Sequence, residues 1–532
     1  MEVVREKQKC KRLILTDMKI GKYLVVFSCL LASCSGIDEM KETASDGEIR
    51  HAVVRIAPYT FDDGETRTGL TYKDDKITFC WDDDETIGVF PIAPYSGSQA
   101  YKHLERSEDD GHVAVFDGAG WKIRPEATYA AYYPYNGSLT SETTFDKIPV
   151  SLKRQVQDGY NNLAHIGRNY DYMCATATAP REGDIEFNFK HITSIVQLEV
   201  TLPEPAVISN IIIFDKQHEQ VFVDSALMNV QTREITPVHK SSMVELEVKN
   251  GVEAKANEKV LFYVAMLPSS SRPVDITVET KDGKCYETSY IPKAMNAGYA
   301  YRWNITPEFA GEHVGVDLGL PSGTKWASMN VGAKAVEGEG NLYAWGETLP
   351  KDVYDYSNYK WGTLKRFFFG EIEMNYTKYS LEDGLTVLSS DDDAATQNWG
   401  AKWRMPTREE CKELIKECAW QMTYDYCGTS VWGFTVTGKN GASIFLPHVG
   451  VYYVTVGAYD DEVKTHIEDH LVIYRSSCLS RGNEDALSFG SNGYPISEYW
   501  NIPEAWDNLK LWMTVTTLYG RYSGIAVRAV CK

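Results

Sequence analysis

The first half of the chain alternates apolar and polar residues with a period of two. Such a pattern buries one face of a β-strand and exposes the other. We therefore expect strands in segments 53–56, 85–90, 128–133, 184–189 and 194–200. Turn signals such as Asp117-Gly118 and Asp282-Gly283 lie between alternating runs, at spacings that suit two stacked β-sandwiches. The 33 tyrosines and 40 glycines also favour strands and turns, so we predict a mainly β fold.

One helix is predicted near the middle of the second half. Thr407 precedes Arg408-Glu409-Glu410, an arrangement in which the threonine hydroxyl and the Glu410 side chain cap the helix reciprocally. A buried stripe at helical spacing follows, formed by Cys411, Leu414, Ile415 and Cys418. Seven residues along a helix separate the two thiols by about 10 Å, too far for a disulfide. We expect both cysteines to be core residues.

A short apolar run near the start of the chain is typical of an export signal. Lys19 and Lys22 precede the run from Tyr23 to Leu31, which is too short to span a bilayer permanently. The run ends in Leu31-Ala32-Ser33-Cys34, which resembles the lipobox of bacterial lipoproteins. That resemblance implies that Cys34 is acylated, becomes the new N-terminus and anchors the protein in the outer membrane. The alternative is a buried apolar segment of a cytosolic fold.

The segments around this signal are not expected to belong to a folded domain. Residues 1–17 mix basic residues with Glu2, Glu6 and Asp17, which does not fit a signal peptide, so we place the true start at Met18 and treat residues 1–34 as leader. Residues 35–48 are small, polar and acidic, and are predicted to form a flexible tether.

The size and charge of the chain narrow the remaining possibilities. Of 532 residues, those after the tether suffice for two to four domains. The net charge of −20, without long basic runs, argues against a nucleic-acid partner. The cysteines form no CxxC pair, so we expect neither a zinc site nor an iron–sulfur site, and no cofactor.

Five motifs follow one another in the first half, in the chain order Asp84 to Phe90, Tyr129 to Asn136, Ile148 to Leu152, Asp171 to Ala177 and Phe187 to Ser194. This series resembles the fimbrillin family of Bacteroidales lipoproteins. The resemblance covers about residues 50–308 and implies two transthyretin-like β-sandwich subdomains, which we place at 49–185 and 186–308. We expect Tyr132 and Tyr133 to be core aromatics, and Lys190 and His191 to be polar strand residues at a sheet edge.

The same resemblance suggests how the protein matures. Fimbrillins are cut by a trypsin-like protease that removes their first strand. Here that strand would run from Ile49 to Phe61, and Arg67 in the following Asp/Gly-rich turn is the candidate cleavage site. The alternative is an ordinary solvated turn.

Four motifs stand out in the second half, namely Val316 to Ala333, Tyr343 to Glu347, Trp403 to Thr407 and Gly524 to Val530. They resemble the Fibrobacter succinogenes major paralogous domain, a module of bacterial surface lipoproteins. We place this module at residues 316–532, after a linker at 309–315, with an α+β fold that could be like a C-type lectin domain. The family's Tyr-Trp-Ser-Ser segment is present only as Glu498-Tyr499-Trp500-Asn501.

Ten of the 13 tryptophans lie in this module. We expect Trp326, Trp345 and Trp403, which stand in apolar motifs, to be core residues. Trp361 lies in a tyrosine-rich loop. Because exposed aromatic side chains stack on sugars and partner surfaces, Trp361 is a candidate ligand-binding residue, together with its neighbours Tyr354, Tyr356 and Tyr359.

No catalytic motif stands out, since the chain contains no HExxH, GxSxG, P-loop or GxGxxG before a helix. The acidic runs Asp82-Asp83-Asp84 and Asp391-Asp392-Asp393 lack the spacing of a calcium loop, so we expect solvated turns and no metal site. We therefore predict a non-enzymatic, lipid-anchored surface protein. It would be a fimbrillin-like subunit, at a fibre tip, that assembles with other fimbrillin subunits and adheres through its C-terminal module to a host or bacterial surface glycan or protein. The alternatives are a carbohydrate-capture lipoprotein of an outer-membrane uptake system and an enzyme.

Overall fold

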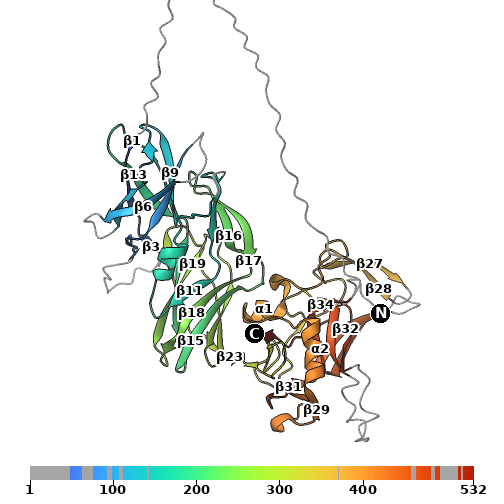
Figure 1. Cartoon of the computed structure of the whole chain (residues 1–532). Coiled ribbons are helices and arrows are strands. Elements are labelled where there is room, and N and C mark those ends of the chain that lie inside the picture. Colours follow the sequence, from blue (N-terminus) through green and yellow to red (C-terminus); the bar gives the residue numbers. More distant parts are fainter. Residues whose placement is uncertain are drawn as a thin grey trace, which may run out of the picture. The chain divides into compact units, whose positions relative to one another are not determined.

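The computed structural model describes residues 48–62, 76–92, 99–106, 112–139, 143–368, 371–456, 463–480, 486–491, 513–516 and 519–532. Residues 46–532 form one compact unit. Within the described ranges, every helix is too short or too polar to cross a membrane. Strands dominate both halves, as Figure 1 shows, which confirms the prediction of a mainly β protein.

The N-terminal part of the described chain is a closed sheet of seven strands. Their order is β12-β13-β2-β7-β6-β5-β9. The strands are β2 (Ala52–Ile56), β5 (Thr86–Pro91), β6 (Gln99–Arg106), β7 (Val113–Asp117), β9 (Thr128–Tyr133), β12 (Met173–Thr178) and β13 (Ile185–His191). The alternating runs at 53–56, 85–90, 128–133 and 184–189 all fall on these strands, so those four predictions are confirmed. A two-stranded ribbon of β1 (Glu48–Ile49) and β8 (Lys122–Ile123) accompanies the closed sheet.

A second group of sheets follows. A five-stranded sheet has the order β19-β14-β22-β3-β4, and a six-stranded sheet has the order β11-β18-β15-β20-β21-β23. The first contains β3 (Tyr59–Phe61), β4 (Lys76–Ile77), β14 (Ser194–Thr201), β19 (Lys259–Met266) and β22 (Tyr299–Ile305). The second contains β11 (Gln155–Asp158), β15 (Ala206–Asp215), β18 (Met243–Ala254), β20 (Val274–Thr280), β21 (Lys284–Tyr290) and β23 (Glu308–Glu312). A three-stranded sheet consists of β10 (Ile148–Ser151), β16 (Phe222–Met228) and β17 (Ile235–Ser241).

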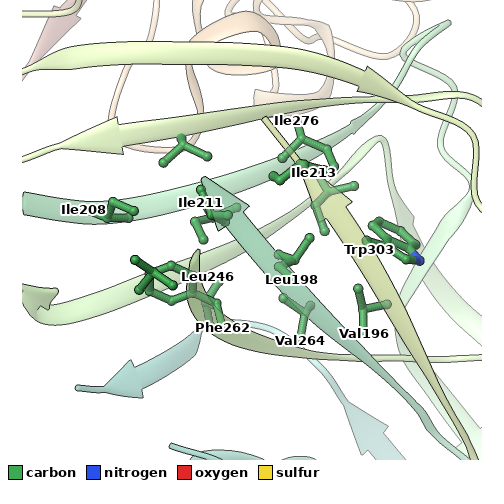
Figure 2. Close-up of a cluster of buried hydrophobic side chains, with 14 of the residues drawn as sticks. Val196, Leu198, Ile208, Ile211, Ile213, Leu246, Phe262, Val264, Ile276 and Trp303 are labelled. Atoms are coloured by element: carbon green, nitrogen blue, oxygen red, sulfur yellow. The ribbon is translucent and has the colours of Figure 1, made fainter. Parts of the chain in front are cut away.

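The five- and six-stranded sheets bury a shared apolar core. Leu198 of β14 and Phe262 of β19 face Ile211 of β15 and Ile276 of β20, and Trp303 of β22 lies at one side of the cluster (Figure 2). These side chains are at most 2% exposed. Fully burying each of them contributes roughly 1.5–3 kcal/mol, which makes this core a main stabilising element of the second group of sheets.

Two details differ from the expected domain limits. β13 extends to His191 within the closed sheet, and β14 begins at Ser194 in the five-stranded sheet, so the change of sheet comes after residue 191. Residues 309–312, expected to be part of a linker, belong to β23, which pairs with β21. The alternating pattern there is too short to be recognised without its partner strand.

The C-terminal part combines small sheets with two helices, α1 (Ala394–Trp399) and α2 (Arg408–Glu417). Its first sheet joins β24 (Gly315–Val316), β25 (Lys325–Ala327) and β38 (Val530–Cys531). The other strands are β26 (Leu342–Tyr343), β27 (Gly362–Phe368), β28 (Glu371–Tyr376), β29 (Ala419–Thr423), β30 (Gly433–Thr437), β31 (Ser443–Pro447), β32 (Val449–Val456), β33 (Val463–Leu471), β34 (Ile473–Leu479), β35 (Ala486–Ser491), β36 (Met513–Thr516) and β37 (Ile525–Ala526). Short helical turns occur at η1 (Ile166–Tyr170), η2 (Ser390–Asp392) and η3 (Tyr426–Gly428).

Helix α2 forms as predicted. Thr407 accepts a hydrogen bond from the Glu410 backbone, and the Glu410 side chain accepts one from the Thr407 backbone, which completes the capping box. Cys411, Leu414 and Cys418 are at most 1% exposed and Ile415 is partly buried against the same core. Trp326, Trp345 and Trp403 are also buried, as expected.

Candidate functional site

The first strand of the closed sheet occupies a central position. β2 pairs in parallel with β13, from Ala52 opposite Ile185 to Ile56 opposite Phe189. On its other side it pairs antiparallel with β7. Ala52 and Val54 are completely buried. Loss of β2 would therefore expose the backbone edges of two neighbouring strands, and such edges readily accept an added strand.

The same segment continues into the five-stranded sheet. β3 pairs in parallel with β22, where Tyr299 lies opposite Thr60 and Ala300 opposite Phe61. It also pairs with β4. Residues 52–61 thus belong to two sheets, and their removal would open both. These residues lie within the segment that the sequence predicts to be removed on maturation.

Tyr59 fixes this segment through a buried polar cluster. Its hydroxyl donates to Asp171 Oδ1 at 2.6 Å, and lies 2.8 Å from Thr193 Oγ1. His191 Nδ1 lies 2.6 Å from the same carboxylate oxygen, and its ring stacks on Tyr59 with centroids 3.7 Å apart. Burial, together with the charge of Asp171, raises the pKa of Tyr59 well above its usual value. Tyr59 therefore stays a neutral donor at all physiological pH values.

The prediction that His191 lies at a sheet edge is wrong. β13 has a neighbour on each side, and His191 is only 5% exposed. The physical reason is that Asp171 and Tyr59 arrive from distant parts of the chain and supply the partners that a buried imidazole needs. Nothing in the local pattern of β13 signals these partners. Tyr132 and Tyr133, in contrast, are core residues as expected.

The aromatic loop of the C-terminal part divides into buried and half-buried members. Tyr354 and Tyr359 are 2% and 4% exposed. The Tyr354 hydroxyl donates to the Leu342 carbonyl, and that of Tyr359 to the Trp345 carbonyl. These two tyrosines therefore point into the protein and anchor the loop through their hydroxyl groups. Any ligand contact in the loop therefore falls to Tyr356 and Trp361, which are half-buried.

Trp361 has a polar setting. Its indole N–H donates to the Gly346 carbonyl at 2.6 Å. The ammonium groups of Lys360 and Lys378 lie 4.3 and 4.8 Å from the ring centroid, distances at which cation–π attraction operates. The same two ammonium groups lie 3.8 and 2.5 Å from the carboxylate of Asp392, so the indole and Asp392 share both lysines.

The acidic run beside this surface is buried, contrary to the expectation of a solvated turn. Asp392 is 2% exposed and accepts hydrogen bonds from the Tyr379 hydroxyl at 2.6 Å and from Lys378 Nζ at 2.5 Å. Asp393 caps α1 by accepting from the Thr396 backbone at 3.0 Å, and burial raises its pKa to about 6. Tyr379 and Lys378 compensate Asp392 from 13 and 14 residues away, whereas Asp393 has one donor in Thr396, three residues further on, and another in the Met405 backbone. Asp392 in turn positions Lys378 beside Trp361.

A cavity of about 760 Å³ borders the second group of sheets. Charged lining residues include Arg154, Glu245, Glu247 and Lys402, and Asn210 Nδ2 donates to Glu245 Oε1 at 2.7 Å. Burial raises the pKa of Glu245. The volume is in the range of small-molecule sites. Among the described lining residues Phe222 is the one aromatic side chain, so stacking on sugar rings is not a feature of this part of the cavity.

Two predicted sites, Cys34 and Arg67, lie outside the described residues. Both stay predictions. The candidate roles of Tyr354, Tyr356, Tyr359 and Trp361 in ligand binding also stay predictions. The structure shows which of the four have accessible surface.

Comparison with known families finds a match in the first half of the chain. Residues 72–316, just under half of the chain, match the model of the fimbrillin-like family. This match confirms the resemblance seen in the sequence for that region. No curated protein matches the chain. The resemblance of the C-terminal part to the Fibrobacter module and its C-type-lectin-like fold stay predictions.

Solved structures with some likeness also come from Bacteroidales. A candidate cell adhesion protein of Bacteroides ovatus is 19% identical, with a TM-score of 0.34, covering 50% of this chain and 95% of that one. One of Bacteroides uniformis is 16% identical, with a TM-score of 0.31, covering 43% and 88%. The C-terminally truncated tip fimbrial protein Mfa3 of Porphyromonas gingivalis is 12% identical, with a TM-score of 0.23, covering 48% and 94%. TM-scores this low do not establish a common fold.

Proposed function

We propose that the protein is a non-enzymatic surface subunit of a fimbrium, placed at the fibre tip, whose C-terminal part is the adhesive end. The fimbrillin-like match over residues 72–316 supports the fimbrial assignment. The observation that carries the tip position is the direct passage from β23 to β24, with only His313 and Val314 between them. The chain thus enters a second folded part immediately after the fimbrillin-like sheets.

That passage matters because polymerising fimbrillins donate a terminal strand to the groove of a neighbour, which gains backbone hydrogen bonds from it. Here β24 pairs with β25, and β25 pairs with β38. Packing is close, since a Cβ atom at Gly315 would lie 2.7 Å from Cys531 Sγ. Strands after β23 could be donated only by unfolding this sheet. The subunit can accept a strand after loss of residues 52–61, but cannot pass one on.

The adhesive role is assigned to the half-buried surface of Tyr356 and Trp361, flanked by Lys360 and Lys378. Partners would be a glycan or protein of a host or bacterial surface, with acidic or hydroxyl groups facing the lysines. The other partners are fimbrillin subunits and, through an acylated Cys34, the outer membrane. Two or more acyl chains on Cys34 would hold the protein firmly in the membrane, because each buried CH₂ contributes roughly 0.8 kcal/mol to membrane binding.

The tip assignment is tested by immunogold labelling of residues 313–532 on intact cells. We expect label at fibre ends. Label spaced regularly along the shaft would contradict a tip subunit, and label confined to the cell envelope would show that the protein acts without polymerising. Cells carrying Trp361→Ala should keep label at fibre ends but adhere less. Tyr424→Ala, which removes a 48% exposed aromatic of the same part, is the matched control.

A second prediction concerns the N-terminus of the mature protein. Mass spectrometry of protein from the membrane fraction should find an acylated N-terminal Cys34, whereas protein from sheared fibres should begin at Thr68 if Arg67 is cleaved. Cys34→Ala should abolish acylation and membrane retention. Fibre-derived protein that still begins at Cys34 would eliminate the proposed maturation, and acylation of Cys34→Ala protein would eliminate the lipobox.

A second candidate function is a carbohydrate-capture lipoprotein of an outer-membrane uptake system, with the polar and charged groups that line the cavity of about 760 Å³ as its binding site. In that case Glu245→Gln would weaken glycan binding in solution, and the protein would be found in the cell envelope. Label at fibre ends together with unchanged glycan binding in Glu245→Gln would rule this alternative out.

A further inference from the structure

Three side chains with metal-binding donors meet at one end of the six-stranded sheet. Glu279 of β20 lies directly opposite Cys285 of β21 in the strand register. His313 follows β23, whose Gly311 lies opposite Cys285. Their exposed fractions are 8%, 0% and 7%, and one donor atom from each lies within 4.8 Å of the others. The register of three adjacent strands therefore brings together a carboxylate, a thiol and an imidazole.

The imidazole of His313 points a buried nitrogen at this cluster. Nδ1 has no hydrogen-bond partner among the described residues, and it lies 3.6 Å from Glu279 Oε1, beyond hydrogen-bond range. The orientation of the residue is fixed on two sides, because its backbone N–H donates to the Gly283 carbonyl at 2.7 Å and its ring stacks on Trp399 with centroids 3.9 Å apart. A buried imidazole nitrogen without a partner is costly unless something occupies its lone pair.

We propose that Glu279, Cys285 and His313 form a Zn²⁺ site, with a water molecule as the fourth ligand. Thiolate, imidazole and carboxylate are the donors that zinc prefers, and three protein ligands plus water is a common tetrahedral set. In such a site the donor atoms lie about 3.5 Å apart. In the structure these atoms lie within 4.8 Å of one another, so each pair must approach by at most about 1.3 Å to reach that spacing. Only one of these ligands is a cysteine, and they stand 6 and 28 positions apart in the sequence, so a search for CxxC pairs does not find them.

A hydrogen bond from outside the site orients one of its ligands, as is usual in protein metal sites. Asn210 Nδ2 donates to Glu279 Oε2 at 3.2 Å and leaves Oε1 directed at His313. Such outer hydrogen bonds orient the ligands of protein metal sites. Burial and the nearby charge of Glu279 raise the pKa of the Cys285 thiol. Zinc binds cysteine as the thiolate, so binding of the ion to Cys285 displaces the thiol proton to solvent.

The position of the site gives it a structural consequence. His313 is the first residue after β23, and Trp399, on which it stacks, belongs to α1 of the C-terminal part. Coordination of Nδ1 would fix this residue to β20 and β21. Zinc would thereby stiffen the connection through which the chain leaves the six-stranded sheet.

The test is a Zn²⁺ and Co²⁺ titration of the purified, metal-stripped full chain. We expect one high-affinity Zn²⁺ per chain by elemental analysis, and a thiolate-to-cobalt charge-transfer band with Co²⁺. Cys285→Ser should abolish the band and weaken Zn²⁺ binding by at least about 100-fold. Loss of an outer hydrogen-bond partner already weakens metal binding by up to about 100-fold, and loss of a ligand should cost at least as much. Cys174→Ser, at a buried cysteine in β12, is the matched control and should bind normally.

Glu279→Gln keeps an acceptor for Asn210 and provides a second variant if Cys285→Ser fails to fold. It should retain the near-ultraviolet circular dichroism of the parent while losing most of its Zn²⁺ affinity. A parent chain that binds no equivalent of Zn²⁺ would overturn the proposal. Undiminished binding in folded Glu279→Gln or Cys285→Ser protein would overturn it as well.

Discussion

Replacing Arg475 by Met is expected to destabilise the C-terminal part by about 3–5 kcal/mol, because each buried acceptor that loses its donor costs about 1–3 kcal/mol. Arg475 lies on β34 and is completely buried. Its guanidinium donates to the Gly520 carbonyl at 2.6 Å and the Ser523 carbonyl at 3.2 Å. It also contacts Ser488 Oγ at 3.2 Å. One cation thus satisfies groups from a strand and from a distant loop, which methionine cannot do.

The measurement is thermal unfolding of the full chain, followed by tryptophan fluorescence because ten of the 13 tryptophans lie after residue 316. We expect the midpoint of that transition to fall by roughly 10 °C. Lys416→Met is the matched control. Its side chain is 81% exposed and pairs with Glu417, so its removal should change stability by less than about 0.5 kcal/mol. An Arg475→Met midpoint equal to that of the control would disprove the role of Arg475.

The strands of the first half could be predicted because each carries its own signal. In β13, Ile185, Phe187 and Phe189 alternate with exposed polar residues, and the burial follows that alternation along the strand. The capping box of Thr407 and Glu410 is local in the same sense, since its partners are three residues apart. Patterns confined to a few neighbouring residues are readable without knowing the fold.

The buried polar contacts could not be predicted, because their partners lie far apart in the sequence. Asp171 binds Tyr59, which is 112 residues away in the sequence, and Asp392 binds Lys378, which is 14 residues away. From the sequence alone, a polar residue is predicted to be exposed unless its buried partner is known. The Glu279, Cys285 and His313 cluster was hidden in the same way, because its members become neighbours only through strand register.

The aromatic loop shows a third limit. The sequence places four aromatic side chains close together and predicts one candidate surface, yet Tyr354 and Tyr359 face the interior, where their hydroxyls satisfy backbone carbonyls. Tyrosine serves both core and surface, and its pattern alone does not separate the two. Only the half-buried Tyr356 and Trp361 keep surface for a ligand.

The stability of α2 depends on an unusually well compensated carboxylate. Glu410 accepts from Arg404 at 2.6 and 2.7 Å, from the Thr407 backbone at 2.9 Å and from the Thr324 hydroxyl at 2.9 Å. Burial by itself would raise its pKa, but the hydrogen bonds from Arg404, Thr407 and Thr324 outweigh burial and lower the pKa to about 2, from 4.5 in the unfolded chain.

This shift makes stability depend on pH in a defined direction. Because the folded pKa is lower than the unfolded one, the carboxylate contributes about 2–3 kcal/mol above pH 4.5, and that contribution is lost progressively as the pH falls toward 2. Glu410→Gln should therefore lower the free energy of unfolding by about that amount at pH 7, and the difference from the parent should shrink between pH 4.5 and pH 2.

Urea unfolding of both chains at several pH values measures this difference. Glu409→Gln is the matched control, since Glu409 lies in the same first turn of α2 but is exposed. It should follow the parent to within about 0.5 kcal/mol at every pH. A Glu410→Gln deficit that stays constant down to pH 2 would mean that the loss is one of packing and hydrogen bonding alone, and that the carboxylate charge does not stabilise the cap.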